Sequence, residues 1–384
     1  MTRWISHWIR YIALLIVGAS VFAQGTPQIP VDARLNETIT FVKNDRLLPV
    51  SLEVTLFKPD GEGPFPVVML NHGKEASNNR LQPRSRYTNV AREFLRRGYA
   101  VVIPMRQGFS NSGGAAVGEG CNIAGNGDAQ ADDIVAVTRW LQSQPWVNGQ
   151  QMMMMGQSHG GLTTLAYAKN PDPGFKLFVN FAGGLMWTSG SCQWQDGLRR
   201  AFGSYGERTK VPSIWFYGEN DSLFPPAVVK PAYQAYVEAG GKAELVAYGP
   251  FGVDAHGMFG TIDGMSIWLD RVLKIMETNG LPTQVTQPKF TPAVKMPKPA
   301  ATQFSKLDDV HAVPCKSEAC KNGYTNFLTK NKPRAFATNG KGPWSLAEIG
   351  DDPYRRSLDN CNRLAKDESC KLYAVDDDVV WTVD

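Results

Sequence analysis

Runs of apolar residues alternate with stretches of helical periodicity over most of the chain. Leu35–Val42 and Val50–Phe57 alternate apolar and polar positions, which predicts two antiparallel strands. Continuous apolar runs typical of buried parallel strands follow at Val67–Leu70, Tyr99–Pro104, Met152–Met155, Phe175–Phe181, Val211–Tyr217 and Lys242–Tyr248. Helical spacing lies between them at Asn89–Arg97, Asp128–Gln142, Pro225–Gly240 and Ser266–Glu277. This alternation predicts an α/β fold, a mostly parallel sheet of about eight strands flanked by helices.

The pattern also predicts where the large domain ends. Residues 30–278 carry the alternating strands and helices, and Asn279–Gln303 is rich in proline and poor in apolar residues, as in a semi-rigid linker. Residues 304–384 then form a small α+β module, with a helix from Asp352 to about Ala365 and two short strands near the end. Within the large domain, Arg106–Gly127 is expected to be a glycine-rich loop. Ala182–Lys210 lacks periodicity and is expected to cross the site as a lid.

The N-terminus reads as an export signal. Residues 1–23 combine Arg3 and Arg10 with a short apolar core and a small residue before Gln24, which predicts cleavage and a periplasmic or secreted protein. An uncleaved anchor is the alternative, but the apolar run is short for a span, so no stable membrane insertion is expected after signal removal. The formal net charge of +4 is too mild to indicate nucleic acid as a partner.

Six cysteines follow the predicted signal: Cys121, Cys192, Cys315, Cys320, Cys361 and Cys370. An even number in an exported chain predicts disulfides, and fifteen connectivities are possible. Pairing neighbours in sequence joins Cys315 to Cys320 and Cys361 to Cys370, which leaves Cys121 for Cys192. No CxxC pair or histidine cluster supplies four zinc ligands, so no metal site is expected.

The most informative stretch is Gly156-Gln157-Ser158-His159-Gly160, between an apolar run and a helix-compatible segment. A serine on a sharp strand-to-helix turn is strained, and glycines two residues away let the chains pass closely. This G-x-S-x-G turn lifts the hydroxyl of Ser158 clear of the sheet at the end of a helix. Ser158 is therefore the candidate nucleophile.

A serine nucleophile needs a base, and the chain has five histidines. His7 leaves with the signal, His311 lies in the small module, and the ring of His159 points away from its neighbour Ser158. His72 follows a central strand, where the backbone of its loop is expected to supply a hydrogen-bond donor and its ring to brace the loop. His256, after the last strand of the large domain, remains as the candidate base.

Asp221 follows the preceding buried strand, so the order Ser158, Asp221, His256 is nucleophile, acid, base. The carboxyl ends of parallel strands share one edge of the sheet, where the three side chains can converge. Asp254 is a rival acid, although its position two residues before His256 indicates a loop-shaping role. Glu219 is a weaker rival.

Two backbone N–H groups are expected to hold the oxyanion of an acyl-transfer reaction. One belongs to His159, and the other to Gly73 or Lys74 in the loop after the Val67–Leu70 strand. Three further residues are candidates for the substrate pocket: Trp187, Trp194 and Arg106. Trp187 and Trp194 could equally pack a flap held by a disulfide, and a salt bridge within its loop is an alternative role for Arg106.

Residues 35–277 resemble an α/β-hydrolase of the dienelactone hydrolase-like group. The resemblance lies in Asn71-His72-Gly73, Gly98–Val102, Gly156–Gly161, Asp221 and Asp254–Gly257. It implies ester hydrolysis through an acyl-enzyme, with no metal or organic cofactor. The name-giving enzymes use a cysteine nucleophile, whereas this chain has Ser158, which moves the expectation to a general serine esterase.

Tyr99–Gly114 also resembles the acyl-peptidase and cocaine-esterase-like branch of the same fold. The sequence therefore predicts a secreted serine hydrolase that acts on small-molecule esters. An acyl-aminopeptidase or dipeptidyl-peptidase-like enzyme is the neighbouring alternative. The alternative of another class is a non-catalytic envelope protein, in which the hydrolase domain is a scaffold and the small module binds a glycan or protein of the envelope.

Overall fold

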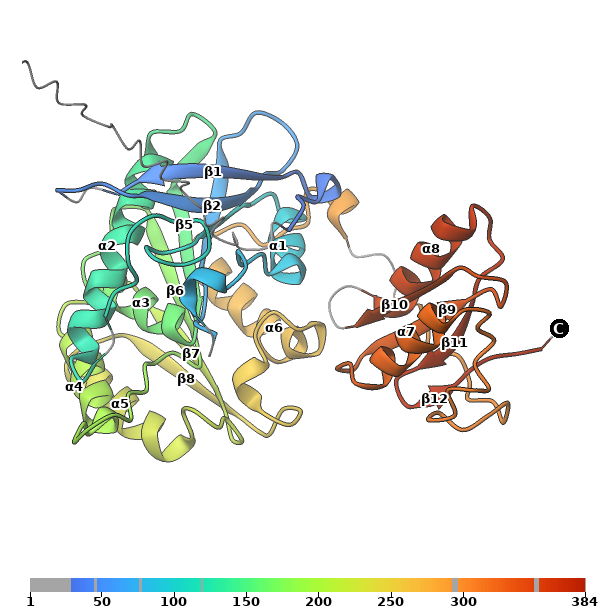
Figure 1. Cartoon of the computed structure of the whole chain (residues 1–384). Helices are drawn as coiled ribbons and strands as arrows, with labels where there is room; N and C mark the ends of the chain where they lie inside the picture. Colours follow the sequence, from blue (N-terminus) through green and yellow to red (C-terminus); the bar gives the residue numbers. More distant parts are fainter. Residues whose placement is uncertain are drawn as a thin grey trace, which may run out of the picture.

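The computed structural model describes residues 29–44, 47–75, 78–118, 120–291, 296–348 and 352–383. The predicted signal, residues 1–23, lies outside the described residues. The large unit contains one eight-stranded sheet in the order β1-β2-β4-β3-β5-β6-β7-β8 (Figure 1). Strands β1 and β2 form the predicted antiparallel pair, β2 is antiparallel to β4, and the other neighbours are parallel. The predicted fold class is therefore confirmed.

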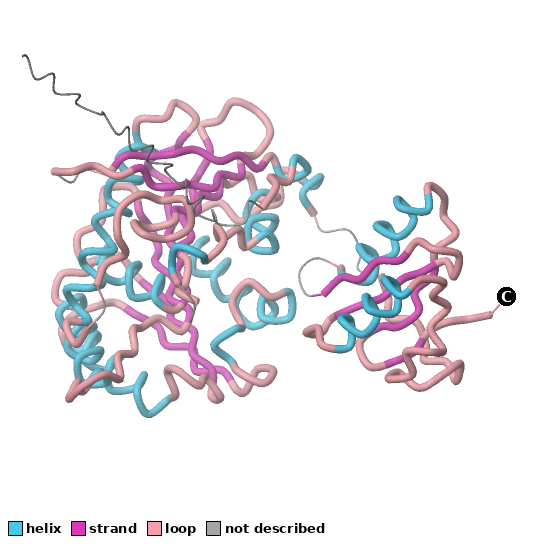
Figure 2. Tube along the Cα trace, in the orientation of Figure 1, coloured by secondary structure: helices cyan, strands magenta, loops and turns pink. Residues whose placement is uncertain are grey.

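The strands of this sheet are β1 (Glu37–Lys43), β2 (Ser51–Phe57), β3 (Phe65–Asn71), β4 (Ala100–Pro104), β5 (Val147–Gln157), β6 (Phe175–Phe181), β7 (Ser213–Gly218) and β8 (Ala243–Tyr248). The helices are α1 (Thr88–Leu95), α2 (Ile123–Gln142), α3 (His159–Ala168), α4 (Trp194–Gly206), α5 (Pro226–Glu238) and α6 (Ile262–Thr278). Figure 2 shows the helices covering both faces of the strands.

Each face of the sheet has its own apolar core. Residues of α2, α3, α4 and α5 pack on one face, and those of α1 and α6 pack on the other. The run Met152–Met155 in β5 is completely buried. Its members alternate between the cores, with Met152 and Met154 on one side and Met153 and Met155 on the other. These methionines are core residues of a strand with both faces covered.

Two expectations about loops were wrong. Helix α2 begins at Ile123 rather than Asp128, because the Asn122 side chain caps it by accepting from the N–H of Gly125. Two glycines lie in its first turns, and because glycine has a low helix propensity, the sequence did not predict a helix there. The expected lid contains α4, whose apolar residues Leu198 and Phe202 are buried in the core that α2, α3, α4 and α5 share. That helix is part of the body of the unit.

The predicted linker packs against both units. Leu281 and Phe290 are buried in the core that α1 and α6 share. The hydroxyl of Tyr99 also donates to the carbonyl of Pro282, at 2.8 Å. Further along, Thr302 donates from its N–H to the carbonyl of Val379 at 2.7 Å. The described parts of residues 279–303 thus belong to the units that they contact.

The small module is an antiparallel sheet in the order β10-β9-β11-β12 with two helices. Its elements are α7 (Glu318–Leu328), β9 (Arg334–Thr338), β10 (Trp344–Glu348), α8 (Pro353–Ala365), β11 (Lys371–Val375) and β12 (Asp378–Val379). The expected helix and two terminal strands are present, which confirms a cysteine-bearing α+β module. The elements α7, β9 and β10 were not predicted.

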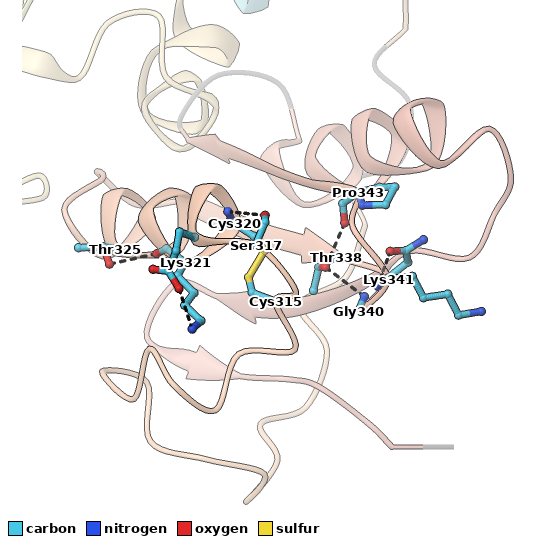
Figure 3. Close-up of a disulfide and its surroundings, with 11 residues drawn as sticks. Cys315, Ser317, Cys320, Lys321, Thr325, Thr338, Gly340, Lys341 and Pro343 are labelled. Carbon is cyan, nitrogen blue, oxygen red and sulfur yellow. Dashed lines mark hydrogen bonds and ion pairs between the residues drawn. A yellow bond between two sulfur atoms is a disulfide. The ribbon is translucent and has the colours of Figure 1, made fainter.

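Three disulfides join the six cysteines in the pairing considered from the sequence: Cys121–Cys192, Cys315–Cys320 and Cys361–Cys370. Cys315–Cys320 closes the first turn of α7, where the Ser317 hydroxyl also accepts from the N–H of Cys320 (Figure 3). Cys121–Cys192 joins the loop before α2 to the segment before α4.

The Cys121–Cys192 disulfide should be the main covalent stabiliser of the large unit. It spans 71 residues, so chain entropy predicts that Cys121→Ser with Cys192→Ser lowers the free energy of unfolding by about 4 kcal/mol. Guanidinium denaturation of the oxidised protein measures this. Cys361→Ser with Cys370→Ser is the control, since that bridge spans 9 residues of the module and should leave the transition of the large unit unchanged. If both double substitutions changed that transition equally, Cys121–Cys192 would not be the main covalent stabiliser of the large unit.

Candidate active site

The turn between β5 and α3 holds Ser158 in a strained conformation. Its φ of 56° and ψ of −123° lie outside the regions that a serine favours. A Cβ on Gly156 would lie 2.1 Å from the carbonyl oxygen of Gly160. A Cβ on Gly160 would lie 2.1 Å from that of Asn71, at the end of β3. Both glycines of the motif are therefore required by close backbone contact, as the sequence predicted.

The structure brings Ser158, His256 and Asp221 into one hydrogen-bonded line. Nε2 of His256 lies 3.0 Å from Oγ of Ser158. Its Nδ1 lies 3.2 and 3.1 Å from the two carboxylate oxygens of Asp221. The side-chain amide of Gln157 donates to the carbonyl of His256 at 3.1 Å, which ties the histidine loop to the serine turn. The geometry allows Nδ1–H to donate to the carboxylate while Nε2 accepts the serine proton.

The two aspartates near His256 differ in what they contact. Asp221 is 2% exposed, and its Oδ1 accepts from the N–H groups of Leu223 and Phe224, both at 2.9 Å. Asp254 instead accepts from the hydroxyl of Ser222 at 2.6 Å and from the backbone N–H of His256 at 2.9 Å. Although burial opposes the shift, these hydrogen bonds lower the pKa of Asp254. Asp254 caps the short 3-10 turn Ala255–Gly257 and thus shapes the loop.

Two of the predicted oxyanion donors, His159 and Gly73, lie beside Ser158. His159 begins α3, and within the described residues its N–H has no hydrogen-bond partner. The backbone of Gly73 comes so close that an added Cβ would lie 3.3 Å from the Cβ of Ser158. The N–H of Gly73 donates to the hydroxyl of Tyr87 at 3.3 Å. The half-buried Lys74 contributes to lowering the pKa of His159 by its charge.

Both histidine rings behind the site are buried and neutral. Burial, and then the charge of Arg106, hold the pKa of His72 and of His159 well below the usual 6.5. The ring of His72 accepts at Nε2 from the N–H of Arg106, at 3.2 Å, and donates from Nδ1 to the carbonyl of Gly73, at 2.7 Å. The ring of His159 contacts Oδ1 of Asn126 at 2.7 Å. Neither ring contacts Ser158 in the described hydrogen bonds.

The three candidate pocket residues differ in burial and in the groups that they contact. Arg106 is completely buried, so it does not line an open pocket, and its guanidinium donates to the carbonyl of His72 at 2.8 Å. In place of the salt bridge expected from the sequence, Arg106 makes this hydrogen bond and a second one, from Nε to Oε1 of Gln130, at 2.7 Å. Trp194 is buried, and the centre of its ring lies 6.1 Å from that of Phe224. Trp187 is half-buried and packs on the first core.

Tyr87 and Phe224 also lie at the site and were not predicted from the sequence. Burial raises the pKa of Tyr87 to about 12, so its hydroxyl stays protonated beside Gly73. The ring of Phe224 lies 5.7 Å from that of His256 and separates it from Trp194. Phe224 lies three residues after Asp221, so its proximity to the candidate acid in the sequence could have indicated that it lies at the site. Tyr87 lies in an irregular segment, and no pattern in the sequence marks it.

Comparison with known proteins finds a family match over part of the chain. The sequence pattern of the X-Pro dipeptidyl-peptidase (S15) family, which belongs to the α/β-hydrolases, matches residues 49–234. This match spans strands β2 to β7 and the serine turn. The chain belongs to the α/β-hydrolase superfamily. The superfamily predicted from the sequence is thereby confirmed.

Individual relatives of this α/β-hydrolase are distant. A cocaine esterase from Rhodococcus sp. is 31% identical over 130 residues, which are 34% of this chain and 21% of the esterase. The chain thus matches about a fifth of the length of that curated relative.

Solved structures that are similar to this α/β-hydrolase include a Klebsiella pneumoniae protein assigned as a dienelactone hydrolase. That protein has a TM-score of 0.45 and 18% identity, covering 63% of this chain and 98% of its own. An esterase from Pyrococcus furiosus has a TM-score of 0.47 and 16% identity, covering 66% and 96%. An acylaminoacyl peptidase from Pyrococcus horikoshii has a TM-score of 0.47 and 16% identity, covering 65% and 42%.

The stability of this α/β-hydrolase should fall below pH 6.5. His72 and His159 stay neutral when folded but take up protons when unfolded, so each depressed pKa favours the unfolded chain as pH falls. Each should lower the free energy of unfolding by about 1.4 kcal/mol per pH unit below 6.5. Denaturation at pH 7.5 and 5.5 measures the effect, and His159→Gln should remove one of the two contributions. The control is His311→Gln at an exposed position. Equal stability of the wild type at both pH values would contradict this account.

Proposed function

We propose that this chain is a serine hydrolase that cleaves carboxylic esters through an acyl-enzyme, with Ser158 as nucleophile, His256 as base and Asp221 as the supporting carboxylate. The observation that carries the proposal is the hydrogen-bonded line from Asp221 through His256 to Ser158, with contacts of 3.0 to 3.2 Å. A serine hydroxyl is a weak nucleophile unless a neighbouring base removes its proton, and this arrangement supplies that base.

The reaction follows from these positions. His256 Nε2 accepts the Ser158 proton as Oγ bonds to the ester carbonyl carbon, and the carbonyl oxygen becomes an oxyanion. The N–H of His159 stabilises that oxyanion together with the N–H of Gly73, which exchanges the Tyr87 hydroxyl for the substrate oxygen. Lys74 is the alternative donor from the same loop. The carbon–oxygen bond to the alcohol then breaks, and His256 returns its proton to the leaving oxygen. Water activated by His256 releases the acid and restores Ser158.

The proposed reaction uses neither a metal nor an organic cofactor. Among the described residues, no group of three or more His, Cys, Asp or Glu side chains is placed to hold a metal ion. Ser158, His256 and the backbone N–H groups account for each proton and for the oxyanion.

The protein is proposed to act in the periplasm or outside the cell. Three disulfides indicate an oxidising compartment. The signal predicted in residues 1–23 would direct export there. In the part of the chain that the structure describes, no helix is long and apolar enough to cross a membrane.

Peptide hydrolysis is the second candidate, because the family match is to X-Pro dipeptidyl-peptidases. The same acyl-enzyme chemistry cleaves an amide when the leaving nitrogen is protonated by His256. An enzyme of that kind also needs a carboxylate for the substrate ammonium. A panel of p-nitrophenyl esters beside aminoacyl and dipeptidyl anilides separates the two, and faster turnover of the anilides would favour the peptidase.

The acid assignment gives a sharp test. Asp221→Asn should lower kcat on a p-nitrophenyl ester by about 10⁴-fold, since the amide favours the wrong histidine tautomer. Asp254→Asn is the matched control and should cost far less, because it alters hydrogen bonds that shape the loop. Ser158→Ala should abolish turnover. A larger loss for Asp254→Asn than for Asp221→Asn would overturn the assignment, and turnover by Ser158→Ala would refute the proposed function.

A further inference from the structure

We infer that Arg106 is a positioning residue that strengthens the oxyanion site through a single peptide group. Its Nη2 donates to the carbonyl oxygen of His72, at 2.8 Å. That carbonyl belongs to the peptide whose N–H is the Gly73 donor. The inference rests on the proposed function and adds a charged residue that does not touch the substrate.

The planarity of the peptide makes this contact directional. In a trans peptide the C=O and N–H point in opposite directions, so a guanidinium behind His72 sets the direction of the Gly73 N–H in front. The next carbonyl is also fixed, because Gly73 O accepts from Nδ1 of His72 at 2.7 Å and from the amide of Gln82 at 3.1 Å. The direction of the Gly73 N–H, which donates to the Tyr87 hydroxyl at 3.3 Å in the absence of substrate, is thus fixed by the groups behind it.

The charge of Arg106 also polarises the peptide. Burial lowers the pKa of Arg106 to about 10, so the guanidinium is still cationic at neutral pH. A cation bonded to an amide oxygen draws electron density from the nitrogen and makes the N–H a stronger donor, as in other hydrogen-bond chains of low dielectric. The effect should be largest in the transition state, when the substrate oxygen carries its negative charge.

The guanidinium is itself held in a built pocket. Its Nε donates to Oε1 of Gln130 in α2, at 2.7 Å, and its carbon lies 5.3 Å from the centre of the Phe109 ring. Asp133 is the nearby negative charge that helps retain the cation, and its Oδ2 accepts from the N–H of Gln107 at 2.7 Å. A flexible surface arginine could not impose a fixed direction on a peptide, whereas this one is completely buried.

The module supplies a matched control. Arg334 is also a buried arginine over a phenylalanine ring, with its carbon 4.8 Å from the centre of Phe327. It too donates to backbone carbonyls, including that of Phe327 at 2.9 Å. Arg334→Met therefore reports the general cost of losing a buried arginine, without a change at the oxyanion site.

The first test compares esters with thionoesters, whose C=S accepts hydrogen bonds poorly. Arg106→Met should lower kcat for the ester roughly tenfold or more, with KM nearly unchanged, and should lower the ester-to-thionoester ratio of kcat by a similar factor. Arg106→Lys retains a charge and should fall between Met and wild type, which provides the ratio if the Met variant does not fold. Arg334→Met should leave the ratio unchanged. An unchanged ratio in both Arg106 variants would overturn the inference.

The second test does not depend on activity. The chain contains three His–Gly peptides, at His72-Gly73, His159-Gly160 and His256-Gly257. Labelling histidine carbonyls with ¹³C and glycine nitrogens with ¹⁵N therefore selects three amide signals in the full-length protein. In Arg106→Met or Arg106→Lys the Gly73 proton should move upfield while the other two stay. A Gly73 signal that does not move contradicts the inference. Inactivity of the wild type towards every ester would instead refute the proposed function.

Discussion

The close approach of the serine turn to the end of β3 is the constraint on which the site depends. A side chain on Gly160 would overlap the carbonyl of Asn71, and one on Gly156 would overlap the carbonyl of Gly160. Because both glycines permit this contact, Ser158 and the Gly73 loop come together at one edge of the sheet. The ends of β7 and β8 then need only supply Asp221 and His256 at that same edge, as parallel strands do.

A layer of buried polar groups stands behind this edge. Asn44 donates from its side chain to Asp133 at 3.0 Å, and Asp133 and Gln130 on α2 lie next to Arg106. The chain of contacts thus runs from the β1–β2 hairpin to the peptide between His72 and Gly73. Burying a charge is costly unless it is well satisfied. The hydrogen bonds of Arg106, Gln130 and Asp133 offset part of that cost, and they fix one geometry of the loop.

Much of this arrangement could be predicted because it lies next to regular elements. Ser158, Asp221 and His256 each follow a strand with a clear apolar pattern, so chain order and strand direction predict their convergence. Tyr87 and the inward position of Arg106 could not be predicted, since both lie in irregular segments whose contacts arise only in three dimensions. The start of α2 was not predicted because two glycines lie in its first turns, and no clear apolar periodicity in the sequence predicted α7, β9 and β10. The roles of the site residues remain predictions that the geometry supports.

The most direct measurement of the central claim is the reaction of the purified, disulfide-intact protein with a fluorophosphonate, followed by peptide mass spectrometry. Such a probe bonds covalently to a serine only where a base and an oxyanion site activate it. The account predicts one adduct per chain, located on Ser158, and none in Ser158→Ala. A folded wild type that stays unlabelled, or that carries the adduct on another residue, would contradict it.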